Sequence, residues 1–246
     1  MERDTWDELF DELYLTTYGP RLDDADAHAD AQAVAALAGI EPPADVLDAP
    51  CGFGRHSIPL AAAGFRVTGI DRSPVQLDAA RERAADDANP RWVQADFRKL
   101  PLPDASFDLA LNLFSSLGYR GEEGDLATLR EFRRVLRPAG ALVVETMHRD
   151  RLMAIFRATD WEELPGGALL LERRSFDQRA GEIETLHLLV EDGGARRSIT
   201  YRMRVYTATE LAALLDRAGF GRVELHGDLE GAPFTRETRL VAVARP

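Results

Sequence analysis

The sequence is short of two residues that support common kinds of chemistry. Its 246 residues include one cysteine, Cys51, and one lysine, Lys99. A single cysteine excludes an internal disulfide and any zinc site that needs several thiolates. A single lysine leaves almost no candidate for Schiff-base catalysis. We therefore expect neither a structural crosslink nor a bound metal.

Two further absences concern partners. The chain contains no signal-peptide pattern and no apolar run long enough to cross a membrane. Basic charge is also scarce, because 42 acidic residues face 30 basic ones and the formal net charge is −12. A strongly negative surface is poorly suited to nucleic acid or anionic lipid. We therefore expect a cytoplasmic protein with neither a membrane nor a nucleic acid as partner.

What the sequence does contain is typical of a globular protein. Hydrophobic residues make up 45% of the chain and charged residues 29%, which are ordinary values for a folded domain. The length allows one large domain with a substantial core, or one domain with an appendage.

A glycine-containing turn near residue 50 is the most informative stretch. It runs from Val46 to Gly54, after a short apolar strand and before a helix that starts near Arg55. Such a turn lets a ligand approach the backbone, and the helix start offers free N–H groups, so the arrangement suits a nucleotide. A dinucleotide site would place a third glycine where Ser57 stands. Asp48 adds a negative charge at the strand end, which disfavours a pyrophosphate and favours a ligand with positive charge.

The string LDAPCGFG resembles the first motif of class I S-adenosylmethionine-dependent methyltransferases. That motif is an acidic residue followed by G-x-G-x-G, and its ligand carries a sulfonium and an ammonium group. Proline replaces the first glycine here, which is tolerable where φ is negative. The resemblance assigns these positions of the turn to the cofactor: Asp48, Pro50, Cys51, Gly52 and Gly54.

Two later predicted strands also end in an acidic residue. Residues 65–71 end in Asp71, whose carboxylate can accept both hydroxyls of a ribose; the alternative is a helix cap, a role that Ser73 fills well. Residues 91–97 end in an acid and an aromatic, which in the methyltransferases bind the adenine amino group and pack on its ring. A terminal acid on a third strand is absent from the dinucleotide fingerprint. The resemblance therefore adds four cofactor residues: Asp71, Arg72, Asp96 and Phe97.

The order of predicted elements indicates the fold. Short apolar strands at residues 45–48, 65–71, 91–97, 109–113 and 141–146 alternate with helices. This alternation predicts a parallel, doubly wound α/β sheet with its ligand at the carboxyl ends of the strands. By resemblance we expect the Rossmann-like seven-stranded methyltransferase sheet, mostly parallel with an antiparallel last strand, plus a small β insertion. Two more residues at the end of the fourth strand then reach the methionine part of the cofactor: Asn112 and Leu113.

Two segments have no place in such a sheet. Residues 148–206 predict a helix and then three strands, at 168–176, 182–190 and 196–206. The first residues carry Trp6, Tyr14 and Tyr18 at the spacing of an amphipathic helix. We expect residues 1–44 to form a helical lid, 45–147 and 207–246 the cofactor-binding core, and 148–206 a roof over the substrate pocket. The alternative is that the leading helix merely packs on the surface; the resemblance instead implies that both tyrosines contact the cofactor.

The sequence shows a cofactor site far better than a catalytic residue. Methyl transfer is an in-line displacement that needs alignment and exclusion of water rather than a covalent nucleophile. His148, just past the fifth strand, is a candidate base, although a polar loop residue is the simpler interpretation. Tyr119 and Phe114 are candidates for contact with the sulfonium through their ring faces. The catalytic residue stays unassigned.

We predict a methyltransferase that moves a methyl group from S-adenosylmethionine to a small-molecule or peptide acceptor and releases S-adenosylhomocysteine. An NAD(P)-dependent oxidoreductase is one alternative, disfavoured by the missing third glycine and by Asp48 and Asp96. A non-catalytic S-adenosylmethionine-binding domain is the other, disfavoured because all three strand ends keep their acids. The acceptor, the accepting atom (N, O or C) and the choice between a monomer and a homodimer remain open.

Overall fold

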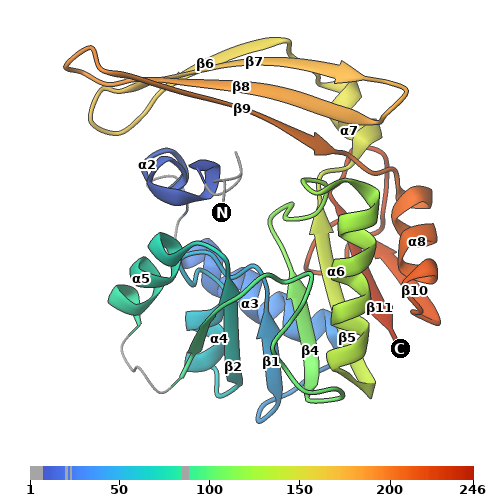
Figure 1. Cartoon of the computed structure of the whole chain (residues 1–246). Helices are drawn as coiled ribbons and strands as arrows, with labels where there is room; N and C mark the ends of the chain where they lie inside the picture. The colour runs from blue at the N-terminus through green and yellow to red at the C-terminus, as the bar shows by residue number, and fades with distance from the viewer. Residues whose placement is uncertain (1–7, 20–21, 23, 85–88) are drawn as a thin grey trace.

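The computed structural model describes residues 8–19, 22, 24–84 and 89–246, and these form two sheets with helices around them (Figure 1). Trp6, Asp23 and Asp87, which belong to predicted helices, lie outside the described residues. None of the helices in these ranges combines the length and the apolar character needed to span a membrane.

The larger sheet has seven strands. From one edge to the other they are β10 (Arg222–His226), β11 (Leu240–Arg245), β5 (Leu136–Thr146), β4 (Phe107–Asn112), β1 (Asp45–Asp48), β2 (Arg66–Asp71) and β3 (Arg91–Gln94). β11 is antiparallel to both of its neighbours, and every other neighbouring pair is parallel. The predicted fold class is therefore confirmed, including the antiparallel last strand.

The central strands of this sheet are buried on both faces. In β1, Leu47 faces the core that contains helix α6 (Gly121–Val135) and helix α8 (Ala208–Arg217), whereas Val46 faces the core that contains α3 (Asp24–Ala38) and α4 (Ser57–Ala62). All of these strand residues are 0% exposed. Successive side chains of a strand point to opposite faces, so an apolar run without polar alternation is what two helical layers require. Helix α5 (Pro74–Arg83) packs on β2 and β3.

Several element boundaries differ from the predicted ones. The periodicity of the sequence predicts a helix from Asp125, but α6 starts four residues earlier, at Gly121. Pro138 and Gly140 predict a turn at residues 137–140, but these residues belong to β5, which starts at Leu136. Phe107 pairs with Leu136 and Leu109 with Ala141, so β5 has three more residues than β4 between these pairs. Such an irregularity lets extra residues enter a strand without ending it.

The smaller sheet is the predicted insertion, and it has four strands rather than three. Its order is β6 (Thr159–Glu163), β7 (Leu169–Asp177), β8 (Glu182–Val190) and β9 (Arg196–Arg204), all antiparallel. Helix α7 (Arg149–Ala154) precedes it and ends four residues before Ala158, where the sequence predicts the end of this helix. β6 is an edge strand of sequence TDWEE with little burial, so it lacks the apolar alternation that reveals a strand. We call this four-stranded sheet the roof sheet.

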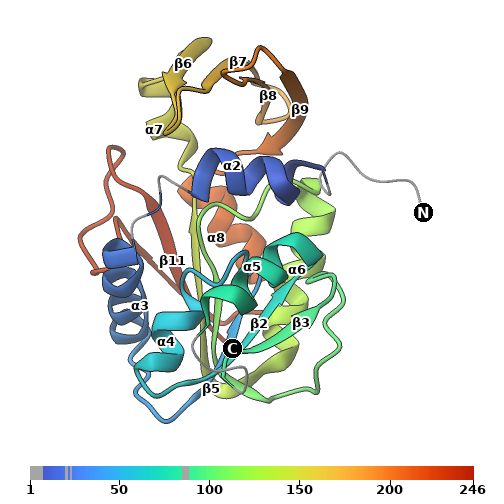
Figure 2. The ribbon, with the colours of Figure 1, turned by 90° about the vertical axis from the view of Figure 1, so that its left-hand side faces the viewer.

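The roof sheet lies above the carboxyl ends of the parallel strands (Figure 1). Between the two sheets lie η1 (Leu9–Leu13) and α2 (Tyr14–Tyr18), which we call the leader. After a quarter turn the leader is again seen between the roof sheet and the large sheet, and α3 and α4 lie together beside the large sheet (Figure 2). The edge of the large sheet where the predicted site residues gather is therefore covered by two segments distant in sequence.

Candidate active site

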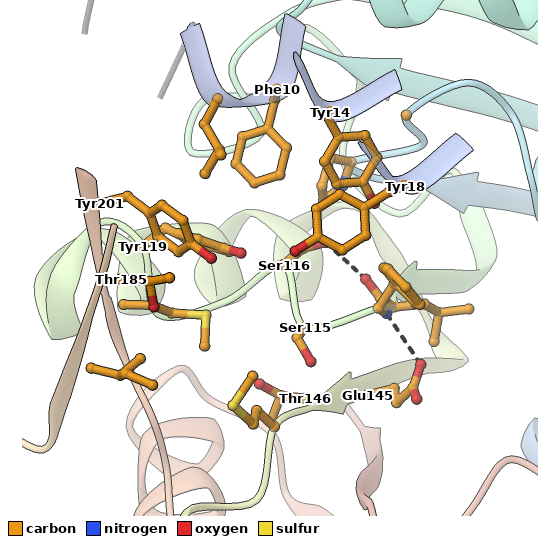
Figure 3. Close-up of a pocket in the computed structure, with 18 of the residues that line it drawn as sticks. Phe10, Tyr14, Tyr18, Ser115, Ser116, Tyr119, Glu145, Thr146, Thr185 and Tyr201 are labelled. Carbon is orange, nitrogen blue, oxygen red and sulfur yellow. Dashed lines mark hydrogen bonds between the residues drawn. The ribbon is translucent and has the colours of Figure 1, made fainter. Parts of the chain in front are cut away.

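A cavity of about 740 Å³ lies between the two sheets. Its walls come from the loops that follow the parallel strands β1 to β5, the leader, helix α7 with the residues after it, and the inner face of the roof sheet. Residues from the leader, from the loop after β4 and from the roof sheet are seen together in Figure 3. Of the residues predicted from sequence, those that line it are Tyr14, Tyr18, Pro50, Cys51, Gly52, Asp71, Arg72, Phe97, Leu113, Phe114, Tyr119 and His148. Those that do not line it are Asp48, Gly54, Asp96 and Asn112.

The turn after β1 forms one wall. Gly52 has φ +52°, a left-handed conformation that glycine adopts without a steric penalty. Gly54 also has positive φ, but it faces away from the cavity, and a Cβ there would lie 2.7 Å from Trp92. The first glycine thus exposes its backbone to the cavity, whereas the second lets the turn pack on the indole ring.

Two predicted cofactor residues brace this turn from below. Asp48 is 1% exposed, and its carboxylate accepts a hydrogen bond from Ser57 Oγ at 2.6 Å. Burial raises the pKa of Asp48 above its ordinary value. Asn112 is fully buried, and its Nδ2 donates to the carbonyl of Ala49 at 2.9 Å. Ser57, which stands where a dinucleotide site has glycine, therefore ties the helix start to the strand end; direct contact of Asp48 and Asn112 with the cofactor stays a prediction.

Asp71 joins the turn to the end of β2. Its Oδ2 accepts from the N–H of Gly52 and its Oδ1 from the N–H of Ser73, both at 2.9 Å. The helix cap of α5 is Ser73, whose Oγ accepts from the N–H of Gln76. Burial raises the pKa of Asp71 to about 6, and hydrogen bonds from the backbone oppose this effect. At pH 7 the group is thus mostly ionised, and Asp71 lines the cavity.

Asp96 and Phe97 separate at the end of β3. The strand ends at Gln94, so both residues lie in the following loop. Phe97 lines the cavity, but the carboxylate of Asp96 is held by Arg98, with Nη2 to Oδ2 at 2.6 Å and the backbone N–H to Oδ1 at 2.9 Å. Partial burial raises the pKa of Asp96, but the hydrogen bonds from Arg98 outweigh it and hold the pKa below its ordinary value. Its contact with adenine stays a prediction.

The leader is fastened beside Asp71. Ser73 Oγ donates to Asp11 Oδ1 at 2.7 Å, and Gln76 Nε2 donates to the carbonyl of Phe10 at 2.9 Å. These two bonds hold the leader on the first turn of α5. No local sequence pattern predicts them, because the partners are more than 60 residues apart.

The loop after β4 forms the floor of the cavity. Phe114 and Ser115 both have φ +58°, and the N–H of Phe114 donates to Glu145 Oε2 at 3.1 Å (Figure 3). The other oxygen of Glu145 pairs with Arg239 at 2.5 Å. Glu145 and Arg239 line the cavity although neither was expected there. The sequence did contain a signal for Glu145. Like the acids used to predict the site at β1 to β3, it is an acidic residue at the carboxyl end of a parallel strand.

The two weak catalytic candidates have different surroundings. His148 lines the cavity but is 4% exposed, with its ring 5.0 Å from that of Phe234 and Nε2 3.6 Å from an oxygen of Asp150. Tyr119 also lines the cavity, and burial raises its pKa well above the ordinary value, so its phenol stays protonated. The side chain of Tyr119 is therefore a neutral ring with a hydroxyl donor rather than a base.

The roof sheet adds polar residues that sequence reasoning missed. Glu172, Arg174, Thr185 and Tyr201 line the cavity from its inner face. Behind them His187 is 1% exposed, and its Nε2 lies 2.7 Å from Glu172 Oε1. Along β8 the apolar alternation of the sequence favours Leu186, Leu188 and Val190 as the covered face, but the structure buries the opposite face, with Ile183, Thr185, His187 and Leu189.

Comparison with known proteins agrees with the whole arrangement. Residues 46–140 match the family described as "Methyltransferase domain". A malonyl-[acyl-carrier protein] O-methyltransferase of Pseudescherichia vulneris is 30% identical over 224 residues, which cover 89% of this chain and 83% of that protein. The structure of the CcbJ methyltransferase from Streptomyces caelestis matches with TM-score 0.80 and 28% identity over 99% of each chain.

A further match is to a structure solved with the cofactor. CalS10, an amino pentose methyltransferase from Micromonospora echinaspora with bound S-adenosylmethionine, has TM-score 0.69 and 24% identity, with 95% of this chain and 96% of that chain covered. The matches to solved structures extend well beyond residues 46–140, so they include the leader and the roof sheet. The two alternatives considered from sequence find no support in these matches.

Proposed function

Because the chain belongs to the class I S-adenosylmethionine-dependent methyltransferases, we propose that its cavity holds the cofactor at the strand ends and a small-molecule acceptor beneath the roof sheet. The observation that carries the proposal is Asp71. Its carboxylate lines the cavity while both oxygens are held by backbone N–H groups of the turn and of α5. A carboxylate fixed in this way is suited to accept two hydroxyls of a ribose.

The surrounding groups fit the remaining parts of this cofactor. Gln76 Oε1 is buried beside Gly52 and has no hydrogen-bond partner among the described residues, so it can accept from a ligand. Arg72 and Phe97 extend the wall beyond Asp71 on the adenine side. Pro50, Cys51 and Gly52 would face the cofactor through their backbone, with Asp48 and Asn112 acting from beneath as supports.

The chain's contribution to the chemistry is alignment and exclusion of water. S-adenosylmethionine supplies an electrophilic methyl group that an acceptor atom attacks in line with the carbon–sulfur bond. The leader and the roof sheet cover the strand ends, and Leu13 packs against Leu164, Leu170 and Leu189 of the roof segment. We propose that the leader acts as a lid and the roof sheet as the acceptor wall, since burial of the reacting atoms strengthens every electrostatic contact there.

A small molecule suits this cavity better than a macromolecule. About 740 Å³ is room for a cofactor with a modest acceptor, and the net charge of −12 disfavours nucleic acid. The printed names of the relatives differ in acceptor, since one names malonyl-acyl-carrier protein and another an amino pentose. We propose a cytoplasmic enzyme that methylates a metabolite, and we propose that side chains of the roof sheet determine which metabolite binds.

Calorimetric titration tests the cofactor assignment. S-adenosylmethionine and S-adenosylhomocysteine should bind and raise the melting temperature, whereas NAD(H) should do neither. Incubation with S-adenosylmethionine and a metabolite extract, followed by mass spectrometry, should yield S-adenosylhomocysteine and a product heavier by one methylene. Binding of NAD(H) without binding of S-adenosylmethionine would overturn the proposal.

A further inference from the structure

Five aromatic side chains from three parts of the chain enclose one side of the cavity (Figure 3). They are Phe10, Tyr14 and Tyr18 of the leader, Tyr119 after β4, and Tyr201 of β9. Ring centroids lie 4.8 Å apart for Tyr18 and Tyr14, 5.4 Å for Tyr14 and Phe10, 5.3 Å for Phe10 and Tyr119, and 5.9 Å for Tyr119 and Tyr201. We call this group the aromatic enclosure.

His187 closes the enclosure into a complete ring of contacts. Its imidazole lies 5.1 Å from the ring of Tyr201 and 6.4 Å from that of Tyr18. The imidazole is itself fixed, because Glu172 stands directly opposite on β7 and binds Nε2 at 2.7 Å. Arg174 in turn binds Glu172. The roof sheet therefore holds the last two members of the ring at a set distance from the leader.

The enclosure is neutral and rich in π electrons. Burial raises the pKa values of Tyr14, Tyr119 and Tyr201 above the ordinary value, so these phenols are uncharged near neutral pH. The face of an aromatic ring carries partial negative charge and attracts a cation, and desolvation strengthens this attraction. Where ring faces border the cavity they favour a cationic group over a neutral group of the same shape, and the charges of Glu172 and Arg174 beside them offset each other.

We propose that the aromatic enclosure binds a basic nitrogen of the acceptor and that this amine is the group methylated, an inference that rests on the proposed function. The enclosure holds the amine as an ammonium ion, which first gives one proton to water, and the neutral amine then attacks through its lone pair. An N–C bond forms while the C–S electron pair returns to sulfur, so the positive charge passes from sulfur to nitrogen and remains beside the rings. The product leaves as an ammonium ion, and the proton already given to water completes the balance without a co-reactant.

The same walls are less suited to methylation of an alcohol. Its oxygen must lose a proton as the methyl group arrives, which needs a base beside it. The phenols are protonated, and the carboxylates of Glu145 and Glu172, which line the cavity, are each paired with an arginine. His187 is 1% exposed and does not line the cavity. His56 and His148 do line it, but they are 7% and 4% exposed and neither belongs to the aromatic enclosure.

The test uses an isosteric pair of probes on the full-length enzyme saturated with S-adenosylhomocysteine. Choline carries a quaternary ammonium group, and 3,3-dimethylbutan-1-ol has the same shape without charge. Ligand-observed NMR or calorimetry should find choline bound roughly 5- to 30-fold more tightly, the range expected for a desolvated cation on aromatic faces. Tyr14→Leu and Tyr119→Leu should each reduce this preference several-fold.

Matched variants separate the rings from the hydroxyls. Tyr14→Phe and Tyr119→Phe keep the ring faces, so they should keep the preference for choline. Equal binding of the two probes, no binding of either, a preference that survives both leucine variants, or its loss in the phenylalanine variants overturns the inference. If the wild type fails to bind S-adenosylhomocysteine at all, the proposed function fails instead, so the two failures are distinguishable.

Discussion

The two sides of the cavity are built by different means. On the strand side, main-chain groups of a tight turn form much of the wall, and the N–H groups of Gly52 and Ser73 both donate to the carboxylate of Asp71. On the roof side, the walls are side chains of the leader and of β7 to β9, brought together by pairing across long distances in sequence. We propose that the strand side holds the cofactor and that the side chains of the roof side determine which acceptor binds.

The physical contexts of the two sides also differ. The turn after β1 is continuous with the buried core, so its side chains cannot change without disturbing the sheet. The roof sheet has one face toward solvent and exposes Trp161 and Leu171 on it. If the inner face forms the acceptor wall, as we propose, substitutions there should alter acceptor binding while the core stays intact.

Removing the leader should have the largest effect on this comparison. We expect a variant that lacks residues 1–17 to lose turnover and to bind the cofactor more weakly, because Tyr14 and the bonds from Ser73 and Gln76 to the leader are lost. Circular dichroism should confirm that the sheet still folds. Unchanged affinity for S-adenosylhomocysteine would mean that the leader is a packing helix and not a lid.

On the strand side, Asp71→Ala should weaken S-adenosylmethionine binding by about 1.5–3 kcal/mol, the scale of charge-assisted hydrogen bonds. Calorimetry measures this directly. Asp78→Ala is the matched control, since Asp78 lies on α5 with a side chain 70% exposed and outside the cavity. Equal affinities for the two variants would remove Asp71 from the cofactor site.

Alanine substitutions at two glycines compare how well the turn and the roof sheet tolerate an added methyl group. Gly54→Ala should lower the free energy of unfolding by about 2 kcal/mol, because φ is +80° and the new Cβ would press on Trp92. Gly193→Ala, in the hairpin between β8 and β9, meets nothing within 4 Å and should change stability by less than about 0.5 kcal/mol. Urea unfolding of both variants provides the measurement, and similar losses would contradict the contrast.

The pH dependence of stability gives the smallest effect. Asp71 has a folded pKa of about 6, above the ordinary value near 3.8, so between these values the folded chain binds more protons than the unfolded one. Its contribution to stability therefore falls as pH rises, by about 1 kcal/mol between pH 5 and pH 7. The difference between wild type and Asp71→Asn, followed by urea unfolding without cofactor, isolates this group. A difference that does not vary with pH would show that the carboxyl group is not perturbed.

The strand side was largely predictable because its signals are local. Strand, turn and helix follow one another within about 20 residues, and the acids at the ends of β1 and β2 come directly after apolar runs. Local order did not reveal which acids would reach the cavity. The carboxylate of Asp48 accepts a hydrogen bond from Ser57 and that of Asp96 from Arg98, and neither residue lines the cavity.

The sequence by itself determined the parallel sheet, the position of the cofactor turn and the existence of a separate β segment, since each follows from periodicity and turn residues within a short window. The tertiary structure alone decided what that β segment covers. Register on β8 places His187 opposite Glu172 and Thr185 opposite Tyr201, and the leader is held between the sheets by bonds to Ser73 and Gln76 and by packing of Leu13 on the roof segment. Such contacts depend on strand pairing between distant residues, and a shift of one residue would turn every one of those side chains to the opposite face.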